Sequence, residues 1–196
     1  RERREEGDIQ QSYANLAWHA PSIDNPDNFV CDVISVLMGG GRSSRLYQTL
    51  VEKERLVTDV SASYFTTKDP SLFLVSGQMP QGAIRKFGER VIEMMKGLAG
   101  GEITSEELEK AKQQLIAATI FARETAESQA FTYGQMGILG RLEDADAYLD
   151  HIRGVTTDDV RRVARTLFTD NGVSVISYEP LIATGPQKPE MITLEN

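Results

Sequence analysis

Residues 39–64 read GGGRSSRLYQTLVEKERLVTDVSASY, and this stretch decides the fold. Ahead of it, apolar residues recur at helical spacing, so the glycine triplet predicts the end of a helix and a tight turn. A second short helix is expected over about 44–54. The part that reads TDVSASYFTT (58–67) has a two-residue period, which predicts a strand. The stretch therefore indicates a helix end, a turn, a helix and a strand in immediate succession.

The neighbouring segments add further strands. A turn at KDP (68–70) joins the strand above to a second one, LFLVSGQM (72–79), as a hairpin. The segment IQQSYANLAWH (9–19) predicts an earlier strand, and VSVISY (173–178) predicts a last one. The sheet therefore contains hairpin-linked strands with helices between the others.

Helical sequence fills the remainder. We expect helices over 25–39, 84–98, 104–136, 142–154 and 156–167. The first starts at Asn25, where Pro26 at the first helical position loses no needed N–H. The third opens with a capping box formed by Thr104 and Glu107. Its buried face is expected to comprise Leu108, Ala111, Leu115, Ala118 and Ala122.

This order of elements predicts an α+β fold. It corresponds to a two-layer sandwich, in which a mostly antiparallel sheet of four to six strands carries helices on one face. Residues 9–181 are expected to form a single domain and 182–196 a C-terminal tail. The charges of RERREEGD (1–8) have no apolar segment behind them, so we do not expect these residues to act as a signal peptide. We interpret 1–8 as a charged linker from an upstream domain.

Composition excludes several classes of partner. The formal net charge of −8 argues against nucleic-acid binding, which favours clustered positive charge. No apolar run approaches the ~20 residues that a membrane-spanning helix needs. Cys31 is the single cysteine, which rules out an internal disulfide and a cysteine-built zinc site.

Familiar catalytic motifs do not occur. No lysine follows the glycine triplet as a Walker loop requires, and the triplet follows a helix rather than a strand. His19 and His151 lie far apart, and neither stands in H-E-x-x-H or its inverse. Cys31 is interpreted as a small buried hydrophobe, and the acidic run EDADAYLD (143–150) as a solvated helix face. We therefore expect no catalytic residue and no metal-binding residue in this chain.

Four segments, in order, carry a family resemblance. Residues 39–64 resemble the signature of the second domain of pitrilysin-type (insulinase family) zinc metallopeptidases, which begins GGG, continues SSRL and ends near LREKRGLAY. Residues 10–41 fit that domain's opening strand and helix, 106–135 its long-helix segment and 155–180 its closing helix and strand. The resemblance covers nearly the whole chain, and the ordered series is more specific than any one motif.

The resemblance implies a place in a larger enzyme. In the family, a zinc-bearing domain with inverse H-x-x-E-H precedes this non-zinc-binding C-terminal domain, and two such halves close around a peptide. This chain would then bind no cofactor itself, with zinc expected in the missing upstream domain. Its expected partners are that domain, a homologous partner subunit and a peptide substrate. Bacterial relatives of this organisation are often exported, which favours the periplasm, with the cytoplasm as the alternative.

One departure from the family pattern concerns transition-state donors. Family members that complete the active site supply an arginine and a tyrosine from this kind of domain, where this sequence has Val51 and Thr58. Valine cannot donate a hydrogen bond, and the threonine hydroxyl is too short to replace a phenol. Arg55 is displaced by about one helical turn. The chamber or partner contacts implied by the signature are Arg42, Ser43, Ser44, Arg45 and Arg55.

Three functional interpretations follow. In two-subunit members, one subunit carries zinc and the other carries the arginine and tyrosine, so a domain lacking that pair fits the zinc-bearing subunit. The chain alone is then expected to be inactive while belonging to a zinc metalloendopeptidase. The alternative is an inactive scaffold or assembly subunit of the same family with no proteolysis. A third interpretation, an unrelated stand-alone binding module, requires the segment matches to be chance.

Overall fold

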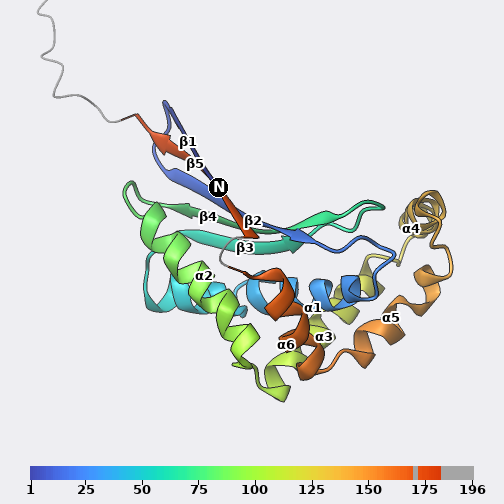
Figure 1. Cartoon of the computed structure of the whole chain (residues 1–196). Helices are drawn as coiled ribbons and strands as arrows, with labels where there is room; N and C mark the ends of the chain where they lie inside the picture. The colour runs from blue at the N-terminus through green and yellow to red at the C-terminus, as the bar shows by residue number, and fades with distance from the viewer. Residues whose placement is uncertain (170–171, 182–196) are drawn as a thin grey trace, which may run out of the picture.

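The computed structural model describes residues 1–169 and 172–181, and the expected tail over 182–196 lies outside these residues. Within them, five strands form one sheet with helices on one face (Figure 1). The strands are β1 (Glu2–Gly7), β2 (Ser12–Ala20), β3 (Asp59–Tyr64), β4 (Ser71–Met79) and β5 (Val173–Pro180). The helices are α1 (Asp27–Gly39), the π-helix η1 (Tyr47–Lys53), α2 (Ile84–Gly100), α3 (Ser105–Phe121), α4 (Ala126–Leu139), α5 (Asp144–Gly154) and α6 (Thr157–Leu167). The predicted α+β fold class is confirmed.

The sheet has the order β1-β5-β2-β4-β3. Strands β3 and β4 form the predicted antiparallel hairpin, with Asp59 opposite Gln78 and Tyr64 opposite Phe73. Side chains of β2 and β4 point alternately to the two faces, so Trp18 and Phe73 both enter the core. The rings of these two residues pack edge-on against Phe168, with centroids 5.3 and 5.2 Å away. This aromatic cluster joins the centre of the sheet to the end of α6.

The N-terminal segment differs from its prediction. Residues 1–8 were expected to be a linker, but Glu2–Gly7 form edge strand β1, which pairs in parallel with β5. Charges are tolerated here because an edge strand faces solvent. Arg4 makes ion pairs with Glu6 and with the largely buried Glu179, both at 3.0 Å. The existence of an upstream domain stays a prediction.

The helix boundaries follow local capping chemistry. The Oδ1 atom of Asn25 accepts a hydrogen bond from the Asp27 N–H at 2.9 Å, so the predicted start of α1 is confirmed. The capping box of Thr104 is also present. The helical sequence expected over 104–136 is divided between two helices, because α3 ends at Phe121 and Thr125 caps a separate helix α4. The Thr125 hydroxyl accepts a hydrogen bond from the Ser128 N–H at 3.1 Å, which stabilises the N-terminus of α4.

The buried face of α3 also differs from its prediction. Leu108 and Ala111 are buried as expected, whereas Ala118 and Ala122 are exposed. Lys112 and Ile116 are buried instead, with Lys112 donating to the Val155 carbonyl oxygen at 3.2 Å. The C-terminal half of α3 therefore leaves the core. None of the described helices combines the length and apolarity needed to cross a bilayer.

Helix α1 lies unusually close to β3. Gly39, the last residue of α1, packs so tightly that an added Cβ would lie 1.9 Å from the Ala62 nitrogen. Such a contact with backbone atoms cannot be relieved by turning a side chain. Glycine at this position is therefore required for the helix to approach the strand.

We predict that Gly39→Ala lowers the free energy of unfolding by about 1–3 kcal/mol, because the backbone of β3 must move. Gly88→Ala is the matched control, since Gly88 lies in α2 with open space around its Cα. Alanine is favoured over glycine within a helix by about 0.5–1 kcal/mol, so the control should be neutral or stabilising. Urea denaturation of both variants measures the difference. Equal stability of the two variants would contradict the packing argument.

Candidate functional site

The glycine triplet forms a turn between α1 and η1, as predicted. Gly41 adopts the left-handed conformation, with φ of 83°, which glycine alone adopts readily. Ser44 closes the turn by donating both its N–H, at 3.1 Å, and its hydroxyl, at 2.7 Å, to the Gly41 carbonyl oxygen. Ser44 is itself buried. Ser44, one of the residues expected to contact a chamber or partner, is therefore a buried residue that stabilises the turn.

Arg45 connects this turn to the start of α3. Its guanidinium binds the Glu107 carboxylate through two hydrogen bonds of 2.8 and 2.7 Å. This guanidinium, together with the N–H and hydroxyl of Thr104, lowers the pKa of Glu107 to about 2. Beside it, Gln114 donates to the Ser43 hydroxyl at 3.0 Å. Arg45 and Ser43 thus hold two elements of the domain together.

The positions of the family's donors have structural roles in this chain. Val51, in η1, packs partly buried against the core. Thr58 donates its hydroxyl to the Gln78 carbonyl oxygen at 3.0 Å, at the open end of the hairpin. Arg55 is exposed and adopts φ of 50°, and Arg42 is also exposed. Contacts of Arg42 and Arg55 with a chamber or partner stay predictions.

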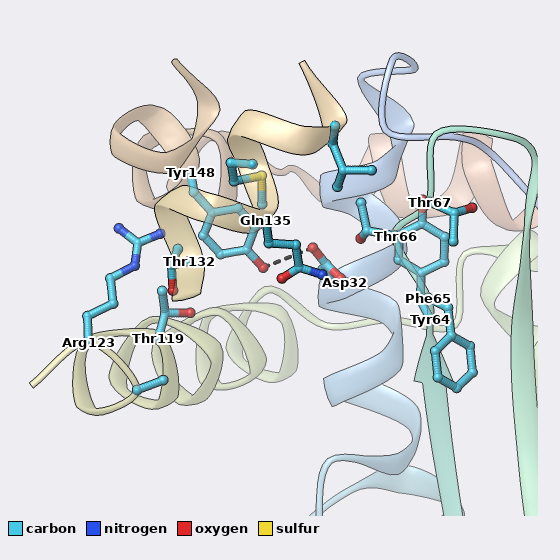
Figure 2. Close-up of a pocket in the computed structure, with 13 residues that line it drawn as sticks. Asp32, Tyr64, Phe65, Thr66, Thr67, Thr119, Arg123, Thr132, Gln135 and Tyr148 are labelled. Atoms are coloured by element: carbon cyan, nitrogen blue, oxygen red, sulfur yellow. Dashed lines mark hydrogen bonds between the residues drawn. The ribbon is translucent and has the colours of Figure 1, made fainter. Parts of the chain in front are cut away.

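A cavity of about 470 Å³ lies where α1, β3, α3, α4 and α5 meet (Figure 2). Asp32 of α1 lines it and accepts a hydrogen bond from the Tyr148 hydroxyl of α5 at 2.9 Å. Burial raises the pKa of Asp32 to about 7, although the Tyr148 hydrogen bond opposes this shift. Burial and the Asp32 charge together raise the pKa of Tyr148. The cavity therefore holds a carboxyl group that titrates near neutral pH.

Sequence reasoning missed this pair. Asp32 and Tyr148 are separated by 116 positions in the chain, so no local motif joins them. The available signal was an acidic residue between Cys31 and Val33, within a helix whose other neighbouring positions are apolar. A carboxyl group at such a position needs a polar partner from another element.

The histidines and cysteine do not form a metal site. His19 is exposed at the end of β2, while His151 stacks on Phe29 with ring centroids 4.3 Å apart. Cys31 is buried, and its burial together with Asp32 raises the pKa of the thiol. Among the residues that the structure describes, no three histidine, cysteine, aspartate or glutamate side chains are grouped as metal ligands. The residues present do not fit a zinc ion.

Comparison with known proteins identifies the family. A family model described as "Peptidase M16 inactive domain" matches residues 1–115. The chain belongs to this family. The resemblance stated from the sequence is therefore confirmed, and the matched residues of this M16 inactive domain include the glycine turn, η1 and the β3–β4 hairpin.

Relatives of the M16 inactive domain are named as proteases. The chain is similar to "Zinc protease PqqE" of Helicobacter pylori, with 25% identity over 88% of this chain and 39% of that protein. It is similar in structure to a protease from Helicobacter pylori, with a TM-score of 0.87, 25% identity and coverage of 92% of this chain and 44% of that one. The chain shares its fold with the "Inactive Peptidase Domain of a Putative Zinc Protease from Bordetella parapertussis", with a TM-score of 0.80, 22% identity, and coverage of 89% of this chain and 96% of that one. The chain thus spans about two fifths of the PqqE relative and nearly all of the Bordetella domain.

We predict that Arg45→Met destabilises the M16 inactive domain by about 1 kcal/mol at neutral pH, a modest value because the ion pair is partly exposed. The folded-state pKa of Glu107, about 2, lies below its ordinary value of 4.5. The pair therefore stabilises fully above pH 4.5 and loses this effect as the pH falls toward 2. Urea denaturation of wild type and variant at several pH values measures the convergence.

The control for this prediction is Arg85→Met, which removes an ion pair with Glu89 on the exposed surface of α2. It should change stability by less than about 0.5 kcal/mol at every pH. If Arg45→Met lowers the free energy of unfolding equally at neutral and acidic pH, the stabilisation comes from the aliphatic part of Arg45. The ion pair with Glu107 would then contribute nothing measurable.

Proposed function

We propose that this chain is the non-catalytic C-terminal domain of a zinc protease, which supports a zinc-bearing domain and completes a peptide-binding chamber. The observation that carries the proposal is the match to the M16 inactive domain. A relative named as a zinc protease continues for about three fifths of its length beyond the region that this chain matches. A polypeptide of that kind has room for a second domain of similar size.

The outer face of α4 supports a role in docking the zinc-bearing domain. Thr132, Gln135 and Met136 line the cavity described above. On other sides of the helix, Phe131 and Ile138 are 71% and 85% exposed. Exposed apolar side chains grouped on one element are typical of surfaces that another protein or domain covers. Figure 1 shows α4 at the periphery, beyond the ends of the strands.

The uncovered face of the sheet supports a role as a chamber wall. Helices α1, α2, α3, α5 and α6 lie on the opposite face of the sheet, and α4 lies beyond the strand ends (Figure 1). On the uncovered face, Tyr13 of β2 and Tyr178 of β5 are paired across the strands and exposed. Asn15 and Ser76 add hydrogen-bonding groups, with the Ser76 hydroxyl donating to the Asn15 Oδ1 atom at 2.6 Å. A peptide can pack on such aromatic rings and bond to such polar groups.

Val51 and Thr58 stand where an arginine and a tyrosine are expected, and this is explained if one subunit binds zinc while its partner supplies the two donors. Neither residue can stabilise a developing oxyanion as an arginine and a tyrosine can. The donors then come from a homologous partner subunit, and zinc comes from the upstream domain. The second candidate function is an inactive scaffold subunit, favoured by the same two residues if no partner supplies the donors.

Zinc content and cleavage of a quenched fluorescent peptide mixture test the proposal. The comparison is between this chain alone and the full polypeptide together with its homologous partner subunit. We expect the chain alone to be metal-free and inert, and the assembled pair to contain zinc and to cleave. A zinc-free and inert assembly would favour the scaffold. Zinc-dependent cleavage by the isolated 196 residues would contradict both functions.

We predict that Phe131→Ser combined with Ile138→Ser weakens association with the zinc-bearing domain at least tenfold, since two anchoring side chains are lost. The stability of the isolated chain should change by less than about 0.5 kcal/mol, because both side chains are exposed. Calorimetric titration of the separated domains measures the affinity. Leu72→Ser, on the uncovered sheet face, is the control. Loss of association in this control alone would place the docking surface on the sheet instead.

A further inference from the structure

The carboxyl group of Asp32 is hydrogen-bonded to a phenol. Its Oδ2 atom accepts the Tyr148 hydroxyl, and no lysine or arginine of residues 1–169 and 172–181 donates to either of its oxygens. By contrast, the partly exposed Glu107 is paired with Arg45 and the buried Glu179 with Arg4. A buried carboxylate is costly unless a cation or several donors satisfy it.

The space beside Asp32 is open. The cavity of about 470 Å³ falls within the range of about 300–1,000 Å³ that small-molecule sites occupy. Figure 2 shows Asp32 and Tyr148 joined by their hydrogen bond at the edge of the cavity, with Gln135 and Thr132 of α4 beside them. A group that enters this space can therefore reach the carboxyl group.

The walls of the cavity combine apolar and polar surface, the latter from four threonines, Gln135 and Arg123. Phe65, Met136 and Leu139 provide the apolar surface, and Tyr64 and Tyr148 add aromatic rings. An aliphatic stem can lie against such side chains while its charged end reaches the carboxylate, as lysine side chains do elsewhere. Aromatic rings also attract cations. The combination suits a positively charged group on a hydrocarbon chain.

We propose that this cavity binds a primary alkylammonium group, with Asp32 as the anionic acceptor. A lysine side chain of a peptide and a free diamine share this chemistry. A hard metal cation is disfavoured, because the cavity lining offers a single carboxylate and such ions require six or more oxygen ligands. The inference concerns the isolated chain and does not depend on the proposed protease function.

Binding of an ammonium group should depend on pH. The groups that face Asp32 are Tyr148 from α5, Tyr64 from β3 and its neighbour Cys31. Arg123 also lines the cavity, and Figure 2 shows it on the side of Tyr148 away from Asp32. The phenol and thiol pKa values are raised, so Asp32 is the group that titrates near neutrality. A cation binds the ionised carboxylate, so binding below the pKa of about 7 must first release a proton.

Titrations followed by amide chemical shifts test the proposal. The probes are the peptide acetyl-Gly-Lys-Gly-amide, its norleucine counterpart, which lacks the ammonium group, and 1,5-diaminopentane. We expect saturable shifts near Asp32 and Tyr148 with the lysine peptide or the diamine and not with the norleucine peptide. Binding of the peptide alone identifies a side-chain site, and binding of the diamine alone identifies a small-molecule site. Affinity should rise about tenfold between pH 6 and pH 8.

Asp32→Asn should weaken binding at least tenfold, because a hydrogen bond to a charged group is lost. Asp146→Asn is the control, since Asp146 is an α5 carboxylate that does not line the cavity and instead accepts from Tyr133. It should leave the affinity unchanged within about twofold. Equal loss in both variants would indicate general attraction to an acidic surface and would overturn the proposal.

Tyr148→Phe provides a second test if Asp32→Asn does not fold. The phenol lowers the pKa of Asp32, so its removal should move the midpoint of the pH dependence upward. A midpoint unchanged in this variant, absence of saturable binding, or equal binding of the norleucine peptide would each overturn the assignment of Asp32 as the acceptor.

Discussion

The contact between α1 and β3 is the constraint on which the other features of this domain depend. With only a hydrogen at Gly39, the end of the helix reaches the backbone of Ala62. This places the glycine turn and η1 beside the hairpin and sets Asp32 near Tyr64 on one side of the cavity. The Tyr64 hydroxyl donates to the Pro21 carbonyl oxygen at 2.7 Å, which fixes the same strand to the approach to α1. Helix α1 and strand β3 are therefore packed as one unit, against which the surrounding elements are placed.

Features specified by neighbouring residues were predictable from the sequence. The capping boxes at Thr104 and Thr156 each require two residues three positions apart, and the β3–β4 hairpin requires a short turn. Features that depend on residues far apart in the chain could not be predicted from the sequence. Strand β1 carries charges at almost every position and is recognisable only because β5, some 170 residues later, offers backbone partners. The break at Thr125 was hidden because the residues around it favour a helix on both sides.

Two sheltered carboxyl groups show how environment decides charge. Glu107 meets a guanidinium and two donors of Thr104, so it remains ionised in the folded domain. Asp32 meets a single phenol, so it is close to half-protonated at neutral pH. Sequence alone could not separate them, because Arg45 lies 62 positions from Glu107 and Tyr148 lies 116 from Asp32. The family match ends at residue 115, ahead of Tyr148, so the resemblance does not supply this pairing either.

The position of β5 has a consequence for biosynthesis. Strand β5, the last of the described strands to leave the ribosome, lies between β1 and β2, which are both made before the helices. Until β5 arrives, β2 presents an unpaired edge next to the completed β4, and β1 has no partner among the described strands. Exposed edges of this kind recruit other chains. The nascent domain therefore has to keep the position between β1 and β2 free of strands from other chains until β5 has been synthesised.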